Sequence, residues 1–302
     1  MNIRTLLSPL LLISLLPPAV SAAERRCSPE DASPPAGWVT PYPAHRVIGN
    51  LYAVGMEDLS VFLLTTPEGH ILINTGLEDS TAPIRDSIES LGFHLEDVKI
   101  LLTMQAHFDH TAALAEIKQL TGAEMWATAK DARVLADGGK SDAQFGECIE
   151  MRFEPVSVDH ILADGEVIEL GGLRLTTHLH PGHTEGSSSY TFTHHEAGRD
   201  YQVAIANMGT INPGKRLLID PTYPGAAEDF AATYRSQKAM TVDVWVAAHG
   251  SQYDLESKHE PRMPYSPDTF VDPEGFLAEV TRLEAIYLEQ LQAERRSAPS
   301  AD

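Results

Sequence analysis

The stretch "QAHFDHT" (residues 105–111) directly follows a short apolar run, "VKILLT", that is typical of a buried strand. It places His107, Asp109 and His110 within four positions of one another. Imidazole and carboxylate groups at the rigid end of a strand are well placed to bind a metal ion. Gln105 stands where a third histidine would complete the string. The stretch is therefore either a working metal site with one unusual ligand or a site that has lost its function.

Two further strings supply histidines in similar positions. "HPGHTEGSSS" places His183 on a Pro-Gly turn just past a predicted strand, and "VWVAAHGS" places His249 at the end of another. A lone histidine is usually structural or solvated, but candidate ligands at three strand ends are hard to explain by packing. Imidazole together with carboxylate suits zinc, and the ligands suffice for two ions. Two zinc ions about 3.5–4 Å apart can hold a hydroxide and a substrate carbonyl together.

The composition narrows the class of protein. The chain has 302 residues, of which 43% are apolar, and this is enough for a substantial core. It has 22 basic and 43 acidic residues, giving a net charge of −21. A surface this acidic repels phosphate backbones, so we expect no nucleic-acid partner. A small-molecule substrate is the expectation, and any anionic one would need a local cation such as a metal.

The N-terminus has the pattern of a secretory signal. Arg4 precedes a short apolar run and the small residues "AVSAA", which predicts a signal peptide over residues 1–23 and a periplasmic or secreted protein. The apolar run is too short for stable membrane insertion. We expect residues 24–302 to form one domain. Cys27 and Cys148 are too few for a cysteine-rich zinc site and form either one disulfide or two free thiols.

Strand and helix patterns alternate along the rest of the chain. Residues 24–45 are proline-rich and are expected to be irregular, whereas "PEGH", "LGGL" and "EAGRD" each predict a hairpin turn between two strands. A helix is expected to bury Leu114, Ile117 and Leu120 on one face, and a long amphipathic helix is expected over roughly 273–296. Two β-rich halves, each followed by helices, predict an α/β fold with two sheets covered outside by helices.

The strings "QAHFDHT", "PGHTEGS" and "AAHGS" together resemble the metallo-β-lactamase superfamily. The resemblance covers most of residues 24–302. It implies an αββα sandwich of two mixed sheets with helices on the outer faces and zinc between the sheet edges. The family pattern usually reads His-x-His-x-Asp-His, and the present sequence departs from it at Gln105.

Within the superfamily, the sequence resembles class B β-lactamases of subclass 3. That resemblance implies one zinc held by Gln105, His107 and His183. It implies a second zinc held by Asp109, His110 and His249, three residues that would also serve catalysis. A GOB-like branch of the subclass carries glutamine at the first position. The implied activity is hydrolysis of the β-lactam ring of antibiotics by metal-bound hydroxide, with one or two zinc ions as cofactor.

Two other interpretations remain open at the level of sequence. A glyoxalase-II-like lactonase or thioesterase of the same superfamily would carry an aspartate bridging both metals. The corresponding stretch, "VAIANMGTIN", holds Asn207 and no acid, and Asp220 lies well beyond it. A non-catalytic zinc-binding protein with a dead site is the interpretation from another class, and Gln105 is its only support.

The sequence also offers weaker candidates for substrate contacts. Hydroxyl and amide groups close to the metal strings predict hydrogen bonds to substrate, and Met208 is expected to be a wall beside the metals because a thioether is a poor zinc ligand. These candidates are Met208, Thr210, Asn212, Ser187 and Ser188. Four further histidines of the same region are expected to be surface or supporting residues: His178, His180, His194 and His195.

Overall fold

The computed structural model describes residues 34–297. The expected signal peptide over residues 1–23 and the side chain of Cys27 therefore lie outside the described residues. Among the described helices, none is both long enough and apolar enough to cross a membrane.

The first sheet has seven strands in the order of the chain. β1 to β4 pair antiparallel, and β4 to β7 pair parallel, so the sheet is mixed. Its strands are β1 (His45–Ile48), β2 (Leu51–Ala53), β3 (Phe62–Thr66), β4 (Gly69–Ile73), β5 (Val98–Leu102), β6 (Glu124–Thr128) and β7 (His160–Leu162).

The second sheet has five strands in the order β12-β11-β10-β9-β8. β8 to β11 form antiparallel pairs, whereas β12 pairs parallel with β11. The "LGGL" and "EAGRD" turns join its strands as expected. These strands are β8 (Val167–Leu170), β9 (Leu173–Leu179), β10 (Ser188–Glu196), β11 (Arg199–Ala206) and β12 (Val244–Ala247).

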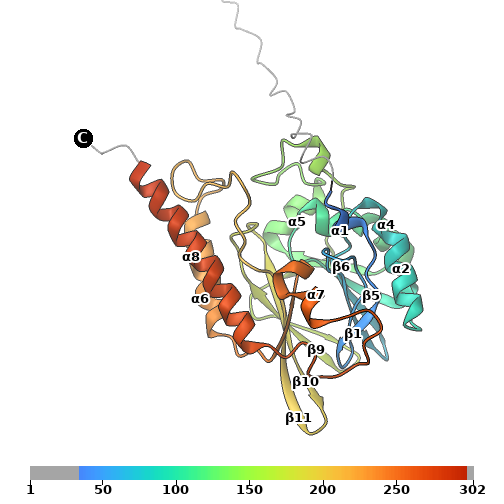
Figure 1. The fold of residues 1–302 in the computed structure, drawn as a ribbon. Coiled ribbons are helices and arrows are strands. Elements are labelled where there is room, and N and C mark those ends of the chain that lie inside the picture. Colours follow the sequence, from blue (N-terminus) through green and yellow to red (C-terminus); the bar gives the residue numbers. More distant parts are fainter. Residues whose placement is uncertain (1–33, 298–302) are drawn as a thin grey trace, which may run out of the picture.

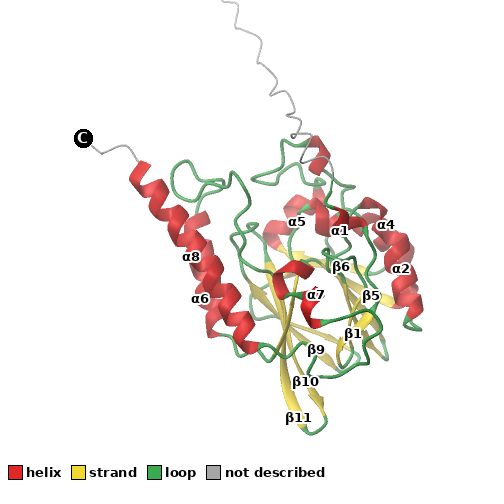
Figure 2. Cartoon of the chain, viewed as in Figure 1, coloured by secondary structure: helices red, strands yellow, loops and turns green. Residues whose placement is uncertain are grey.

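Helices cover the outer face of each sheet (Figure 1). The strands lie at the centre, with helices on both sides of them (Figure 2). The α-helices are α1 (Ala36–Val39), α2 (Thr81–Ser90), α3 (Phe108–Thr111), α4 (Leu114–Thr121), α5 (Ala129–Ala136), α6 (Ala226–Ala239), α7 (Leu255–Lys258) and α8 (Pro273–Ser297). The 3-10 turns are η1 (Glu78–Ser80), η2 (Leu95–Asp97), η3 (Ile149–Met151) and η4 (Gly250–Tyr253).

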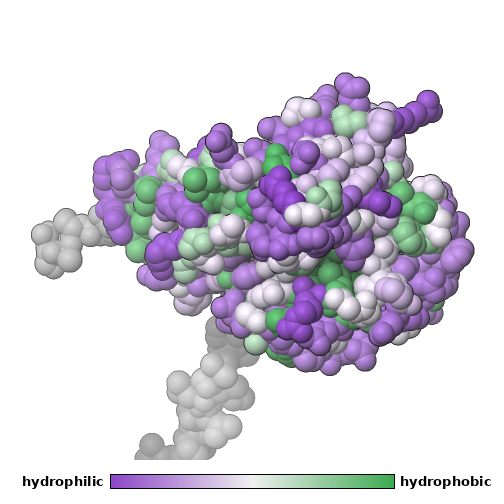
Figure 3. All heavy atoms as spheres, turned by 90° about the horizontal axis from the view of Figure 1, so that it is seen from below, coloured by the Kyte–Doolittle hydropathy of each residue, from purple (hydrophilic) through white to green (hydrophobic). Residues whose placement is uncertain are grey.

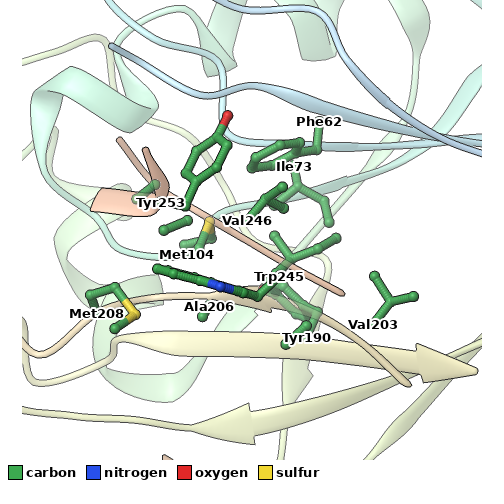
Figure 4. Close-up of a cluster of buried hydrophobic side chains, with 14 of the residues drawn as sticks. Phe62, Ile73, Met104, Tyr190, Val203, Ala206, Met208, Trp245, Val246 and Tyr253 are labelled. Atoms are coloured by element: carbon green, nitrogen blue, oxygen red, sulfur yellow. The ribbon is translucent and has the colours of Figure 1, made fainter. Parts of the chain in front are cut away.

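The largest core lies between the two sheets. Phe62 and Ile73 of the first sheet face Tyr190, Val203 and Trp245 of the second (Figure 4). Side chains of α6 and α8 join the same cluster from the outer face of the second sheet, and a separate apolar cluster packs α2, α4 and α5 against the first. These layers are those of an αββα sandwich, which confirms the expected architecture.

Two details differ from the sequence expectations. Residues 24–45 were expected to be irregular, but α1 forms within them at Ala36–Val39. Leu114 and Ile117 of α4 are buried as expected, whereas Leu120 is 44% exposed because α4 ends at Thr121, with the left-handed Gly122 as its C-cap. The surface seen from below is mainly hydrophilic, with apolar groups in separate patches (Figure 3).

Candidate metal centre

The first metal string begins where β5 ends. The turn after β5 is held by the Asn74 side chain, which accepts a hydrogen bond from the Met104 N–H at 2.9 Å. The Thr103 hydroxyl donates to the carbonyl of Gln105 at 2.7 Å. His107 then serves as the N-cap residue of α3, which carries Asp109 and His110 in its first turn. This strand-to-helix junction brings the string into a fixed, buried position.

The His183 turn is fixed by contacts from two other segments. The Thr128 hydroxyl at the start of α5 donates to the Gly186 carbonyl at 2.8 Å, and the Thr184 hydroxyl donates to buried Asp131 at 3.1 Å. The Lys215 ammonium donates to the His183 carbonyl at 2.8 Å. His183 is therefore held rigidly at the end of the sheet, as expected for a ligand.

His107 and His183, two of the three ligands expected for the first zinc, are brought together, and the third, Gln105, is buried two positions before His107. The Nε2 atom of His183 lies 3.1 Å from the Nδ1 atom of His107. The other nitrogen of His183, Nδ1, lies 2.8 Å from the Thr210 carbonyl, which makes Nδ1 the protonated nitrogen and leaves Nε2 as a lone-pair donor. Gln105 is 2% exposed, and its Oε1 atom is buried with no hydrogen-bond partner.

Asp109, His110 and His249 form the second donor set. Each offers one ligand atom, and these atoms all lie within 4.8 Å of one another. Asp109 Oδ2 is 3.1 Å from His110 Nε2 and 3.6 Å from His249 Nε2. Both nitrogens of His110 are buried without a hydrogen-bond partner. Burying a polar atom without a hydrogen-bond partner costs folding free energy unless another group, such as a metal ion, interacts with it.

The geometry of these atoms suits zinc. Two imidazole nitrogens bound at 2.0–2.1 Å to one tetrahedral zinc would lie roughly 3.3 Å apart, close to the 3.1 Å between His107 and His183. Neutral imidazoles, a carboxylate and an amide oxygen are all accepted zinc donors. A bound ion would satisfy the orphaned oxygen of Gln105 and one of the two orphaned nitrogens of His110.

Burial and neighbouring charges shift the pKa values of four of the donors. Burial lowers the pKa of His183 well below its usual range and also lowers that of His110, so both rings are neutral at pH 7. Burial alone would raise the pKa of Asp109, but the neighbouring His110 and His249 hold it below its ordinary value. Asp109 is therefore an anion. Burial alone would lower the pKa of His249, but Asp58 and Asp109 raise it above its usual value, so the protonated form of this ring is favoured in the metal-free protein.

Two carboxylates beside the ligands were not found from the sequence. Asp142 Oδ2 lies 3.5 Å from His107 Nε2, and Asp58 Oδ2 lies 3.4 Å from His249 Nδ1. Lys215 was also missed; burial lowers its pKa to about 8. Local sequence around these three residues carries no ligand-like spacing, so only the tertiary fold reveals them.

Aromatic rings from α1 and from the loop after α5 flank the donor sets. The Trp38 ring of α1 lies 5.5 Å from that of His249, centroid to centroid, and the Phe145 ring lies 5.1 Å from that of His107. Trp38 is fixed by its indole N–H, which donates to Asp58 at 3.1 Å. The rings form apolar walls next to otherwise polar donors, and the sequence analysis did not identify them.

The residues suggested for substrate contacts have mixed environments. Ser187 and Ser188 are each 1% exposed. The Ser187 hydroxyl accepts the Thr184 N–H, and the Ser188 hydroxyl donates to the Thr103 carbonyl and to the Tyr190 hydroxyl. The Thr210 hydroxyl lies 2.9 Å from His183 Nδ1 and thus supports that histidine. Met208 is fully buried and packs in the core between the sheets (Figure 4). Asn212 is half-buried, close in sequence to Lys215.

A bridging acid of the glyoxalase-II kind does not lie at the expected stretch. Asn207 is buried there, and its side-chain amide donates to the Met104 carbonyl at 2.7 Å, which is a structural role. Asp220 is 88% exposed at its side chain and pairs with Arg216 at 3.0 Å, in contrast to the buried donor sets.

The other histidines have partners away from the donor sets. His178 and His180 bond hydroxyls of Thr191 and Ser189, and His195 pairs with Asp200. Their contacts fit the supporting and surface roles expected for them.

Comparison with known proteins places this architecture in a family. The model of the metallo-β-lactamase superfamily matches residues 56–196. The metallo-β-lactamase GOB-18 from Elizabethkingia meningoseptica is 40% identical, with a TM-score of 0.83 over 86% of this chain and 96% of that chain. The class B3 di-zinc metallo-β-lactamase LRA-12 from an Alaskan soil metagenome is 44% identical, with a TM-score of 0.82 over 85% and 97%.

The fold is that of the metallo-β-lactamase superfamily, and the chain belongs to this family of hydrolases. Within the superfamily, the similarity to class B3 enzymes confirms the expected resemblance to subclass 3. A hydroxyacylglutathione hydrolase from Jannaschia sp. is 30% identical over 137 residues, or 45% of this chain and 44% of that protein. The chain spans about half the length of the curated relatives it matches.

Proposed function

We propose that this protein is a zinc-dependent β-lactamase. The observation that carries the proposal is the pair of adjacent donor sets, Gln105–His107–His183 and Asp109–His110–His249, with amide-bearing Asn207 where a bridging acid would be needed for the thioesterase type. Support comes from β-lactamases that are 40–44% identical over at least 85% of the chain.

Each donor set would hold one zinc ion. Bound zinc supplies Lewis-acid chemistry and a water-derived nucleophile near neutral pH. Asp109 is the only anionic ligand, and its carboxylate fixes the second set against His110 and His249. Because the ligands are buried at strand ends, the chain presents them in a fixed arrangement before substrate arrives.

The residues around the donors suit a compact, partly apolar, anionic molecule such as a β-lactam. Trp38 and Phe145 form apolar walls beside the two sets. Lys215 places a cation behind His183 in a protein whose overall charge is −21, so it offsets the field that would repel an anion. Thr210 fixes the tautomer of His183.

A thioesterase or lactonase is the second candidate. The relationship to hydroxyacylglutathione hydrolase favours it, whereas the exposed Asp220 and the structural role of Asn207 argue against it. The third candidate, a zinc-binding protein without catalysis, would need the Gln105 set to be incapable of binding metal.

We also propose that the protein is exported to the periplasm or secreted. The signal pattern of residues 1–23 supports this proposal. Cys148 is disulfide-bonded, which suits an oxidising compartment.

Metal replacement tests the proposed function. Zinc in the purified protein is counted by elemental analysis, removed with a chelator, and then restored. Opening of a cephalosporin ring should disappear with the metal and return with added zinc. Zinc-loaded protein that opens no β-lactam would reject the proposal, and protein that binds no zinc would reject the metal sites as well.

A further inference from the structure

Asp142 faces the nitrogen of His107 that does not face His183. Its Oδ2 atom is 3.5 Å from His107 Nε2, and its side chain is 10% exposed. Its Oδ1 atom accepts the backbone N–H groups of Gln144 at 2.8 Å and Phe145 at 2.6 Å. Two backbone donors thus fix the carboxylate and leave one oxygen directed at the imidazole.

The loop that carries Asp142 is tightly closed. The Asp142 N–H bonds the Gly139 carbonyl at 3.1 Å, and the Gly146 N–H bonds the Asp142 carbonyl at 3.1 Å. A Cβ atom at Gly146 would lie 2.3 Å from the Lys140 carbonyl oxygen, so only glycine allows this approach. The carboxylate is therefore placed by backbone geometry and not by a flexible side chain alone.

The two nitrogens of His107 face different groups. Nδ1 faces His183 Nε2, where a shared ion would lie, and Nε2 faces Asp142. A carboxylate at Nε2 favours the tautomer with its proton on Nε2 and its lone pair on Nδ1. The 3.5 Å separation is longer than a well-formed hydrogen bond. The distance between Asp142 Oδ2 and His107 Nε2 can therefore shorten when metal binding fixes the ring.

Charge distinguishes this contact from the others in the same donor set. Gln105 is a neutral amide, and His183 Nδ1 faces the neutral carbonyl of Thr210. Asp142 is the carboxylate that pairs with this set, just as Asp58 pairs with His249 of the other set at 3.4 Å. In the second set, Asp109 already contributes a negative charge as a ligand.

We propose that Asp142 is a positioning residue for the Gln105 set: it orients His107 and supplies the negative charge that a glutamine ligand lacks. The inference rests on the proposed zinc sites. With Asp142 in this place, a set with an amide ligand can still bind zinc, because the carboxylate strengthens His107 as a donor and offsets part of the charge of a divalent cation.

Stepwise zinc affinity tests the inference without relying on activity. Zinc binding is measured by competition with a chromophoric chelator for the native protein, Asp142→Asn and Asp58→Asn. We expect Asp142→Asn to weaken one zinc step by 10- to 100-fold and to leave the other unchanged. Asp58→Asn should weaken the opposite step. Anomalous diffraction at partial zinc loading identifies which donor set has emptied.

Asp137→Asn is the matched control. Asp137 belongs to the same loop region and accepts the Ser141 N–H at 3.1 Å, so it has the same kind of backbone role as Asp142. The structure records no ion pair between it and a ligand histidine. Both zinc affinities should stay within twofold of the native values in this variant. A loss of the same step in both variants would show that loop integrity, and not the His107 contact, is responsible.

A second measurement uses the native protein and needs no variant. In ¹⁵N-labelled, zinc-loaded protein, His107 should carry its proton on Nε2, with slowed exchange with solvent. A proton on Nδ1, or unchanged zinc affinities in Asp142→Asn, would overturn the inference while leaving the proposed function intact. Native protein that binds no zinc at His107 and His183 would instead contradict the proposed function.

Discussion

The Nε2 atom of His183 faces the Nδ1 atom of His107 across 3.1 Å, although the two residues belong to different sheet edges. The other nitrogen of each ring faces a different group: His183 Nδ1 lies 2.8 Å from the Thr210 carbonyl, and His107 Nε2 lies 3.5 Å from the Asp142 carboxylate. One nitrogen of each ring thus faces the other ring, and the Oε1 atom of Gln105 is buried without a hydrogen-bond partner. These features support the proposal that Gln105 belongs to an adapted metal site and not to a decayed one.

Replacing Gln105 by histidine should strengthen this site. An amide offers zinc a neutral and weaker donor than imidazole, so the Gln105 set should empty before the Asp109 set as zinc becomes scarce. Gln105→His should raise bound zinc toward two per chain in chelator titrations. Gln202→His, on β11, is the control and should leave the amount of bound zinc unchanged. Equal affinities at both native sites, or a first zinc located at Gln105, would contradict this account.

Removing Asp109 should abolish the second donor set. Its carboxylate is the only anionic ligand and contacts both His110 and His249. We expect Asp109→Ala to lose one zinc ion and to lower kcat/KM by roughly 10² or more. Asp200→Ala, which removes an exposed partner of His195, is the control. Near-native turnover in Asp109→Ala would mean that the catalytic site lies elsewhere.

Acid should destabilise the metal-free protein through His45. Burial, with His259 stacked at 3.9 Å between ring centroids, lowers the pKa of His45 to about 4. As pH falls, the unfolded chain binds a proton at His45 before the folded chain does. The contribution of neutral His45 to the free energy of unfolding is therefore fully present above pH 6.5 and is lost as pH falls toward 4. The loss at pH 4.5 is about 2–3 kcal/mol.

Denaturant unfolding at pH 7 and pH 4.5 measures this loss. His45→Phe keeps an aromatic ring against Phe270 and removes the titrating group. The variant should lose less stability between the two pH values than the native protein does. The same loss in both proteins would assign the acid sensitivity to other groups, such as buried His180.

The sequence predicted those parts of the site that depend on local pattern. His107, Asp109, His183 and His249 each follow an apolar run that the fold uses as a strand, so their proximity follows from strand ends meeting at one edge. Asp142 was missed because it lies in a loop without periodicity.

The second missed carboxylate and the misjudged segments have a related cause. Asp58 meets His249 only because η4 folds back on the loop after β2, with the Ser251 N–H donating to Asp58 at 2.8 Å. Helix α1 was missed because prolines dominate its flanks, although Trp38 anchors it to Asp58. Contacts of this kind depend on tertiary packing and leave no local pattern in the sequence.

Export should leave a defined N-terminus. If residues 1–23 are a cleaved signal, protein recovered from the periplasm should begin near Glu24 in mass spectra, and Cys148 should be unreactive to thiol reagents until reduced. Cytosolic expression of residues 24–302 is the comparison. Active soluble protein that retains Met1 would reject the signal assignment.

The relative rates on four substrates test the central claim most directly. Zinc-loaded protein is assayed with a carbapenem, a cephalosporin, a lactone and a thioester, each with and without chelator. We predict that kcat/KM is highest for a β-lactam and that chelator abolishes ring opening, because the proposed site has two zinc donor sets and has Asn207 in place of a bridging acid. Lactone or thioester hydrolysis that exceeds every β-lactam by orders of magnitude would contradict the account.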